Sequence, residues 1–135
     1  RKTVKTIVNV GHHFSVRRKR NIYWANLEQL PWDVFYVRLA KKDHDNVDLS
    51  YFRAFENVIN QAKLMNKLPV LCHCQMGAHR GPTAGIAAAW ILNGKNKTDL
   101  DALIGTVTNL RHRYSRSVET PYRKTMMEFM YSESN

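Results

Sequence analysis

An α/β fold is predicted for this chain of 135 residues, with a central, mostly parallel sheet flanked by helices. Three short segments rich in β-branched or apolar residues predict strands at 5–10, 33–39 and 69–73. Longer segments separate them, which is typical of parallel strands joined by crossovers. The third strand is short and apolar enough that we expect both of its faces to be buried.

Two helices are expected around the third strand. The first follows Asp48 or Ser50 as its N-cap, and its apolar residues recur at three- and four-residue steps. The second runs over 82–92 and ends at Asn93 and Gly94, a sequence that favours a helix stop. Being apolar all round, this second helix should be buried. The expected core face of the first helix comprises Phe52, Phe55, Val58, Ile59 and Ala62.

Two further helices are expected in the last third of the chain. Thr98 is predicted to cap one of them, with Asp99 and Asp101 in its first turn, where the helix dipole favours anions. Thr120 and Pro121 predict the start of the other. The expected core residues are Leu100, Leu103, Ile104, Val107 and Leu110 in the first, and Met126, Met127, Phe129 and Met130 in the second.

Length and composition predict a single domain over 1–135, which we expect to be a monomer. No run approaches the roughly 18 apolar residues of a membrane span, and no signal peptide opens the chain, so an intracellular, cytoplasmic protein is expected. The formal net charge of +10 favours an anionic partner, whether a phosphate ester, a nucleic acid or an acidic membrane surface.

The chemistry is expected at the end of the third strand, where Cys74 and Arg80 enclose a short loop that leads into the helix near Pro82. Such a loop can point its backbone N–H groups, together with the positive end of the helix, at one bound phosphate. The same field stabilises a thiolate, so Cys74 is predicted to be an ionised nucleophile. Arg80 can bind two phosphate oxygens through its planar fork, and Gly77 allows a close approach of the backbone.

With the motif His73-Cys74-Gln75-Met76-Gly77-Ala78-His79-Arg80, the chain resembles the cysteine-based protein tyrosine phosphatase superfamily, and most closely its small dual-specificity members. Their signature is His-Cys, five residues, then Arg. The resemblance extends over roughly residues 4–131 and implies the phosphotyrosine phosphatase-like fold. It also implies that Gln75, Met76, Gly77, Ala78 and His79 bind the substrate, that His73 orients the loop from behind it, and that no cofactor is needed.

In that family an aspartate on a mobile loop upstream of the cysteine protonates the leaving oxygen and then activates water. Asp43 matches its position, and such a group typically contributes about 10²–10⁴-fold to the rate. Asp45 lies in the same short loop and is the alternative, whereas Asp48 is expected to cap a helix.

The chain departs from the family pattern at Gly81, where a Ser or Thr usually helps the sulfur to leave. Thr83 is shifted by two residues from that place. As a result, we expect slow hydrolysis of the covalent intermediate, with a burst of product before steady turnover.

Two other features of the sequence have more than one interpretation. Cys72 is expected to pack as a small buried side chain, although a disulfide with Cys74 is an alternative. No metal is expected, because Cys72-His73-Cys74 lacks the spacing of a zinc site. Residues 17–20 are four consecutive cations followed by Tyr23 and Trp24, and they are either a basic rim of the cleft or a solvated loop.

The sequence therefore predicts a phosphatase that hydrolyses phosphate monoesters through a cysteinyl-phosphate. Phosphotyrosine in proteins is the leading substrate, with phosphoserine and phosphothreonine beside it. The alternatives are RNA 5′-phosphates or inositol phosphates with the same chemistry, a phosphate-binding module with little turnover, and, last, a sulfur-transferring domain.

Overall fold

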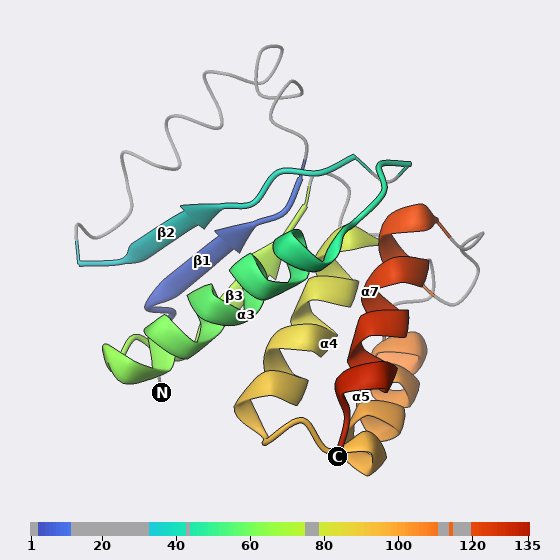
Figure 1. Ribbon diagram of the computed structural model, residues 1–135. Helices are drawn as coiled ribbons and strands as arrows, with labels where there is room; N and C mark the ends of the chain where they lie inside the picture. Colours follow the sequence, from blue (N-terminus) through green and yellow to red (C-terminus); the bar gives the residue numbers. More distant parts are fainter. Residues whose placement is uncertain (1–2, 12–32, 43, 75–78, 111–113, 115–119) are drawn as a thin grey trace.

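The computed structural model describes residues 3–11, 33–42, 44–74, 79–110, 114 and 120–135. Three parallel strands form one sheet in the order β2-β1-β3 (Figure 1), which confirms the predicted α/β class. They are β1 (Thr6–Asn9), β2 (Phe35–Arg38) and β3 (Val70–His73). In the register of this sheet, Asn9 pairs with Arg38 on one side and with His73 on the other, so these residues share the carboxyl edge.

The two outer strands are less buried than the central one. Val8 of β1 is fully buried, whereas Leu71 of β3 is 46% exposed. The expectation that β3 is buried on both faces is therefore wrong. β3 lies at an edge of the described sheet, and its alternate residues Val70 and Cys72 pack against the core while Leu71 points the other way.

Helix α3 (Leu49–Leu64) follows β2 and begins at the cap predicted for it. The Asp48 carboxylate accepts a hydrogen bond from the Tyr51 N–H at 2.8 Å, and Ser50 donates to the same carboxylate instead of capping the helix itself. Four of the five predicted residues are buried, and the fifth, Val58, is only partly buried. Together with Tyr51, which was not predicted, the buried face comprises Tyr51, Phe52, Phe55, Ile59 and Ala62. Through this face the helix packs against the core.

Helix α4 (Arg80–Leu92) is the central helix of the molecule, in contact with β3, α3, α5 and α7 (Figure 1). It begins two residues before the predicted Pro82 and ends at Asn93, followed by Gly94 with a positive φ of 90°. Both the buried character and the stop were predicted. Its apolar surface on nearly every side is explained by neighbours on nearly every side.

Helix α5 (Lys97–Leu110) differs from the prediction in its cap residue and in the burial of its last residue. The side chain of Asn96 accepts a hydrogen bond from the Thr98 N–H at 2.8 Å, so Asn96 is the cap and Thr98 lies inside the helix. Leu110 is 76% exposed, so its assignment to the core is also wrong. Leu100 is the fully buried residue of this helix, with Leu103, Ile104 and Val107 packed partly against the core.

Helix α7 (Pro121–Glu133) has the predicted cap, because the Thr120 hydroxyl accepts a hydrogen bond from the Arg123 N–H at 3.2 Å. Met126 and Met130 are fully buried, with Met127 and Phe129 partly buried beside them, so the methionine cluster belongs to the core as predicted. In the part of the chain that the structure describes, no helix combines the length and the hydrophobicity needed to cross a bilayer.

Candidate active site

The predicted site residues that the structure describes lie at the carboxyl edge of the sheet, where parallel α/β proteins bind their ligands. Cys74 directly follows β3 and is only 9% exposed. The backbone is fixed here by the Val10 N–H, which donates to the His73 carbonyl at 2.8 Å. His73 Nδ1 lies 3.3 Å from the Cys74 carbonyl oxygen, a hydrogen bond when Nδ1 carries the proton. Thus His73 contacts the backbone at the point where the loop begins.

The first turn of α4 packs directly on the cysteine. A Cβ added to Gly81 would lie 3.1 Å from the Cys74 nitrogen and 3.3 Å from its Sγ, so glycine allows a contact that a larger residue would crowd. His79 is the N-cap residue, and its side chain does not cap the helix. The sulfur therefore lies against the positive end of a 13-residue helix, a place that favours bound phosphate oxygens.

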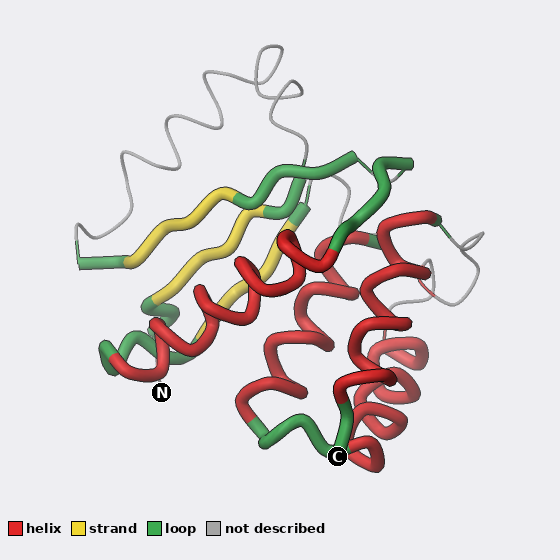
Figure 2. The backbone as a smooth tube through the Cα atoms, in the orientation of Figure 1, coloured by secondary structure: helices red, strands yellow, loops and turns green. Residues whose placement is uncertain are grey.

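Arg80 connects this turn with the segment that follows β2. Arg80 is 6% exposed, and its Nη1 donates a hydrogen bond to the Lys41 carbonyl at 2.5 Å. The Lys41 N–H donates in turn to the Val10 carbonyl at 3.2 Å. Figure 2 shows this segment leaving β2 at the carboxyl edge and returning to the start of α3. Sequence reasoning missed the contact, since a backbone carbonyl carries no residue-type signal.

Several predicted residues lie outside the described part of the chain. They are Asp43, the loop residues from Gln75 to Ala78, and the basic and aromatic residues at 17–20, Tyr23 and Trp24. The structure places the remaining ones, Cys74, His79 and Arg80 with His73 behind them, at one end of the sheet. The residues on either side of Asp43, Lys42 and His44, are described.

The two other carboxylates of that loop are engaged with backbone groups. The Lys42 N–H donates to Asp45 Oδ2 at 3.0 Å, and this bond holds the pKa of Asp45 below its ordinary value. The Asp48 cap has a lowered pKa for the same kind of reason, the hydrogen bond from the Tyr51 N–H. Both groups are stabilised as carboxylates, which suits them poorly to donating a proton.

Thr83 does not replace the hydroxyl that Gly81 lacks. Its side chain is fully buried, and its Oγ1 shares a hydrogen bond with the Tyr114 hydroxyl at 2.9 Å. This hydrogen bond joins α4 to Tyr114.

Cys72 is partly buried, and burial raises the pKa of its thiol to about 12. The alternative disulfide between Cys72 and Cys74 is not formed. Across the described ranges, no group of three or more His, Cys, Asp or Glu side chains is placed to hold a metal ion.

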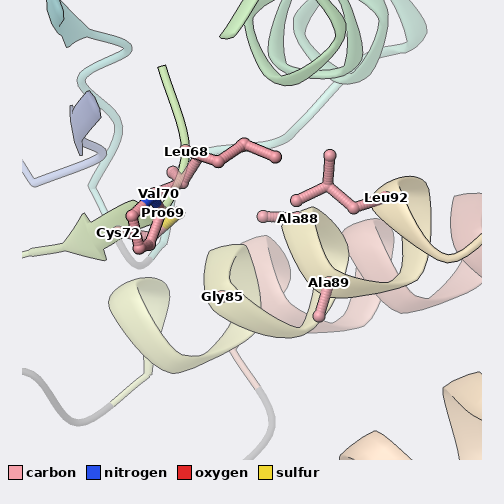
Figure 3. Close-up of a pocket in the computed structure, with 8 residues that line it drawn as sticks. All are labelled: Leu68, Pro69, Val70, Cys72, Gly85, Ala88, Ala89 and Leu92. Carbon is pink, nitrogen blue, oxygen red and sulfur yellow. The ribbon is translucent and has the colours of Figure 1, made fainter. Parts of the chain in front are cut away.

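Two pockets lie behind the site, along the groove between β3 and α4. One of about 370 Å³ is lined only by apolar residues, glycine and the Cys72 thiol, and so offers no charge to a phosphate (Figure 3). The other, of about 430 Å³, extends to His73 and Gly81 and to Val107 of α5. The apolar pocket of Figure 3 therefore does not fit the phosphate predicted at Cys74 and Arg80.

A family profile describes the same region of the chain. The profile of the PTP-like phytases, described by the words inositol hexakisphosphate, matches residues 1–92. The chain belongs to the PTP-like phytase family. The matched span holds all three strands, α3, the Cys74 to Arg80 motif and α4.

Membership of the PTP-like phytases places the chain among the cysteine-based phosphatases, which confirms the resemblance inferred from the motif. The chemistry of this family is phosphate-ester hydrolysis. No curated protein and no solved structure matches the chain.

Proposed function

We propose that residues 1–135 act as one catalytic domain that hydrolyses an inositol polyphosphate through a covalent cysteinyl-phosphate on Cys74. The observation that carries the proposal is the contact of Cys74 with the first turn of α4, next to the buried Arg80. A sulfur anion and a phosphate monoester are both stabilised by that combination of helix end and guanidinium. The family profile supports the same chemistry.

In the first step, the Cys74 thiolate attacks phosphorus while the ester P–O bond breaks. Arg80 and the amides of the 75–79 loop hold the phosphate oxygens, and Asp43 gives its proton to the leaving alcohol. Asp43 is preferred over Asp45 as the acid, because the hydrogen bond from Lys42 stabilises Asp45 in its charged form.

In the second step, water attacks the phosphorus of the cysteinyl-phosphate and Asp43 accepts the proton from that water. The S–P bond breaks, and the electron pair returns to the Cys74 sulfur as inorganic phosphate leaves. Residue 81 is a glycine, so it offers no hydroxyl to help the sulfur leave in this step.

The charge around the site supports a polyanionic substrate. Arg38 ends β2 at the carboxyl edge, and Lys41 and Lys42 follow in the adjoining segment. The sequence of the 75–79 loop contains no acidic residue, and the whole chain has a net charge of +10. Cations gathered at one edge attract a substrate with several phosphates and hold those that are not being cleaved.

Phosphotyrosine in proteins, the leading substrate predicted from the sequence, becomes the second candidate. The His-Cys-five-residue-Arg signature and the order of elements resemble those of dual-specificity phosphatases. The two candidates share every catalytic residue. They differ in how strongly binding depends on charges away from the cleaved phosphate.

A substrate comparison tests the proposal. Phosphate release is measured on inositol hexakisphosphate, a phosphotyrosine peptide and a 5′-triphosphorylated RNA, with Cys74→Ser as the control. We expect the highest kcat/KM on inositol hexakisphosphate and no activity above background in Cys74→Ser. A preference for the peptide would change the proposed substrate to phosphotyrosine and leave the proposed mechanism unchanged. Activity that persists in Cys74→Ser would refute the mechanism.

A further inference from the structure

Two buried tyrosines meet the backbone of the segment that leads to Asp43. The Tyr51 hydroxyl of α3 donates to the Leu39 carbonyl at 2.8 Å and lies 3.0 Å from the Tyr122 hydroxyl of α7. Because the Tyr51 hydroxyl donates its one proton to the Leu39 carbonyl, it can only accept from Tyr122, and the Tyr122 hydroxyl is the donor of that bond. A directed chain of hydrogen bonds therefore runs from α7 through α3 to the segment after β2.

The placement of Tyr51 is determined by the start of its helix. Its own N–H is the donor to the Asp48 cap, so the same residue fixes both the beginning of α3 and the contact with Leu39. The rings of Tyr51 and Tyr122 meet edge to face, with centroids 5.8 Å apart. Lys41 Nζ also lies 5.6 Å from the centroid of the Tyr51 ring.

Four partners, from the end of β1, α3 and α4, hold the backbone from Leu39 to Lys41. The Leu39 N–H donates to the Asn9 carbonyl at 2.8 Å and the Lys41 N–H to the Val10 carbonyl, both at the end of β1. The Leu39 carbonyl accepts from Tyr51, and the Lys41 carbonyl accepts from Arg80. Asp43 follows two residues after the last of these fixed groups.

We propose that Tyr51, supported by Tyr122, is a positioning residue that holds this segment where Asp43 can protonate the leaving group. The inference rests on the proposed function and assigns a role to two residues that take no part in the chemistry. Burial raises the pKa of Tyr51 to about 12 and that of Tyr122 well above its ordinary value, so both hydroxyls keep the protons that the chain of bonds needs.

A pair of substrates tells positioning apart from a general structural effect. p-Nitrophenyl phosphate has a leaving group that departs without protonation, whereas phenyl phosphate has a poorer leaving group that needs the acid. The kcat/KM value is the proper measure, since it reports P–O cleavage even when hydrolysis of the intermediate is slow. Tyr51→Phe should lower kcat/KM roughly tenfold on phenyl phosphate, a part of what an acid contributes, and less than about twofold on p-nitrophenyl phosphate.

Matched variants sharpen the test. Tyr122→Phe leaves the Tyr51 bond to Leu39 in place and should have a smaller effect of the same kind. Tyr131→Phe removes a hydroxyl that donates to Asp101 at 2.5 Å on α5 and should match the wild type on both substrates. In an Asp43→Asn background, Tyr51→Phe should cause no further loss on phenyl phosphate, because the group that it positions is gone.

Equal losses on the two substrates, or a full additional loss in the Asp43→Asn background, would overturn the proposal. Melting temperatures of all variants show whether a uniform loss comes from unfolding. Turnover that disappears in Cys74→Ser, measured in the same series, distinguishes a failure of this inference from a failure of the proposed function.

Discussion

Gly81 is the residue at which this chain departs from the Ser or Thr that usually follows the arginine in cysteine-based phosphatases. The structure shows what the glycine does instead, since it lets the first turn of α4 approach Cys74 more closely than a side chain would allow. The Thr83 hydroxyl is bonded to Tyr114 and does not take over the missing role. The second chemical step is where this difference should appear.

The Gly81 prediction is tested by rapid-mixing kinetics. Wild type should release a burst of p-nitrophenol from p-nitrophenyl phosphate, followed by slower steady turnover. Gly81→Ser should raise kcat severalfold over Gly81→Ala, which has the same added Cβ but no hydroxyl. Crowding against Cys74 should cost both variants about 1–3 kcal/mol of unfolding free energy. A wild type without a burst would contradict the expectation.

Asp43 and Asp45 should respond differently to the same substitution. Asp43→Asn should lower kcat/KM on phenyl phosphate by about 10²–10⁴-fold through loss of the general acid. Asp45→Asn should have only a small effect, because that carboxylate is held in its charged form by the Lys42 N–H. The reverse order of the two losses would reassign the acid to Asp45.

Cys72 should be chemically silent while the protein is folded. Its pKa is raised from 9.0 to about 12 by burial, so the thiol stays neutral and iodoacetamide should label Cys74 alone at neutral pH.

Unfolding restores the ordinary pKa of Cys72, so the stability that comes from its neutral thiol is complete below pH 9.0 and is lost as the pH rises toward about 12. The stability difference between wild type and Cys72→Ala should shift accordingly above pH 9.0, and peptide mass spectrometry after alkylation reports the labelling.

At the level of single residues, the sequence reveals groups whose chemistry is unusual and hides contacts that use the backbone. Cys74 and Arg80 stand out by type and spacing. The bond from Arg80 to the Lys41 carbonyl does not, because any residue at position 41 would offer the same acceptor. The pairing of Thr83 with Tyr114 is hidden for a related reason, since it depends on how α4 packs.

At the level of elements, the start of α5 is the clearest difference between prediction and structure. Asn96 and Thr98 are both good cap residues two positions apart, and the observed bond runs from the Thr98 N–H to the Asn96 side chain. Asn96→Ala should therefore lower the unfolding free energy by about 1 kcal/mol in urea denaturation. Thr98→Ala should change it by less than about 0.5 kcal/mol. Equal losses of unfolding free energy in the two variants would contradict the assignment of Asn96 as the cap.

The other elements were predictable because their signals are local. Strand segments, the Asp48 and Thr120 caps and the stop at Gly94 each depend on a few neighbouring residues. The exposure of Leu71 and Leu110 was not predictable in this way. Periodicity shows which residues share a face, but only the position of the neighbouring elements decides whether that face is covered.

At the level of the whole molecule, an ion-pair network joins helices that are distant in sequence. Both Arg53 guanidinium nitrogens contact the Glu133 carboxylate, at 2.7 and 2.6 Å. Lys95 lies 3.4 Å from Glu133 and also pairs with Glu56. The network ties α3, the turn after α4 and the end of α7 together, around the same core that positions α4 at the active site.

Removing Glu133 should therefore weaken the molecule slightly and in a salt-dependent way. Arg53 lowers the pKa of Glu133, so its contribution is complete above the ordinary value of 4.5 and is lost as the pH falls below it. Glu133→Gln should cost no more than about 1 kcal/mol at low salt, since Arg53 is largely exposed, and less at high salt. Thermal unfolding at two salt concentrations measures the difference, and a loss independent of salt would contradict an electrostatic origin.

The central claim is that Cys74 carries the phosphoryl group during catalysis, and intact-mass spectrometry after rapid acid quench tests it most directly. Wild-type protein mixed with inositol hexakisphosphate should gain the mass of one phosphoryl group, located on Cys74 by peptide mapping, and Cys74→Ser should gain none. A wild type that releases phosphate with no adduct on Cys74, or an adduct that persists in Cys74→Ser, would contradict the account.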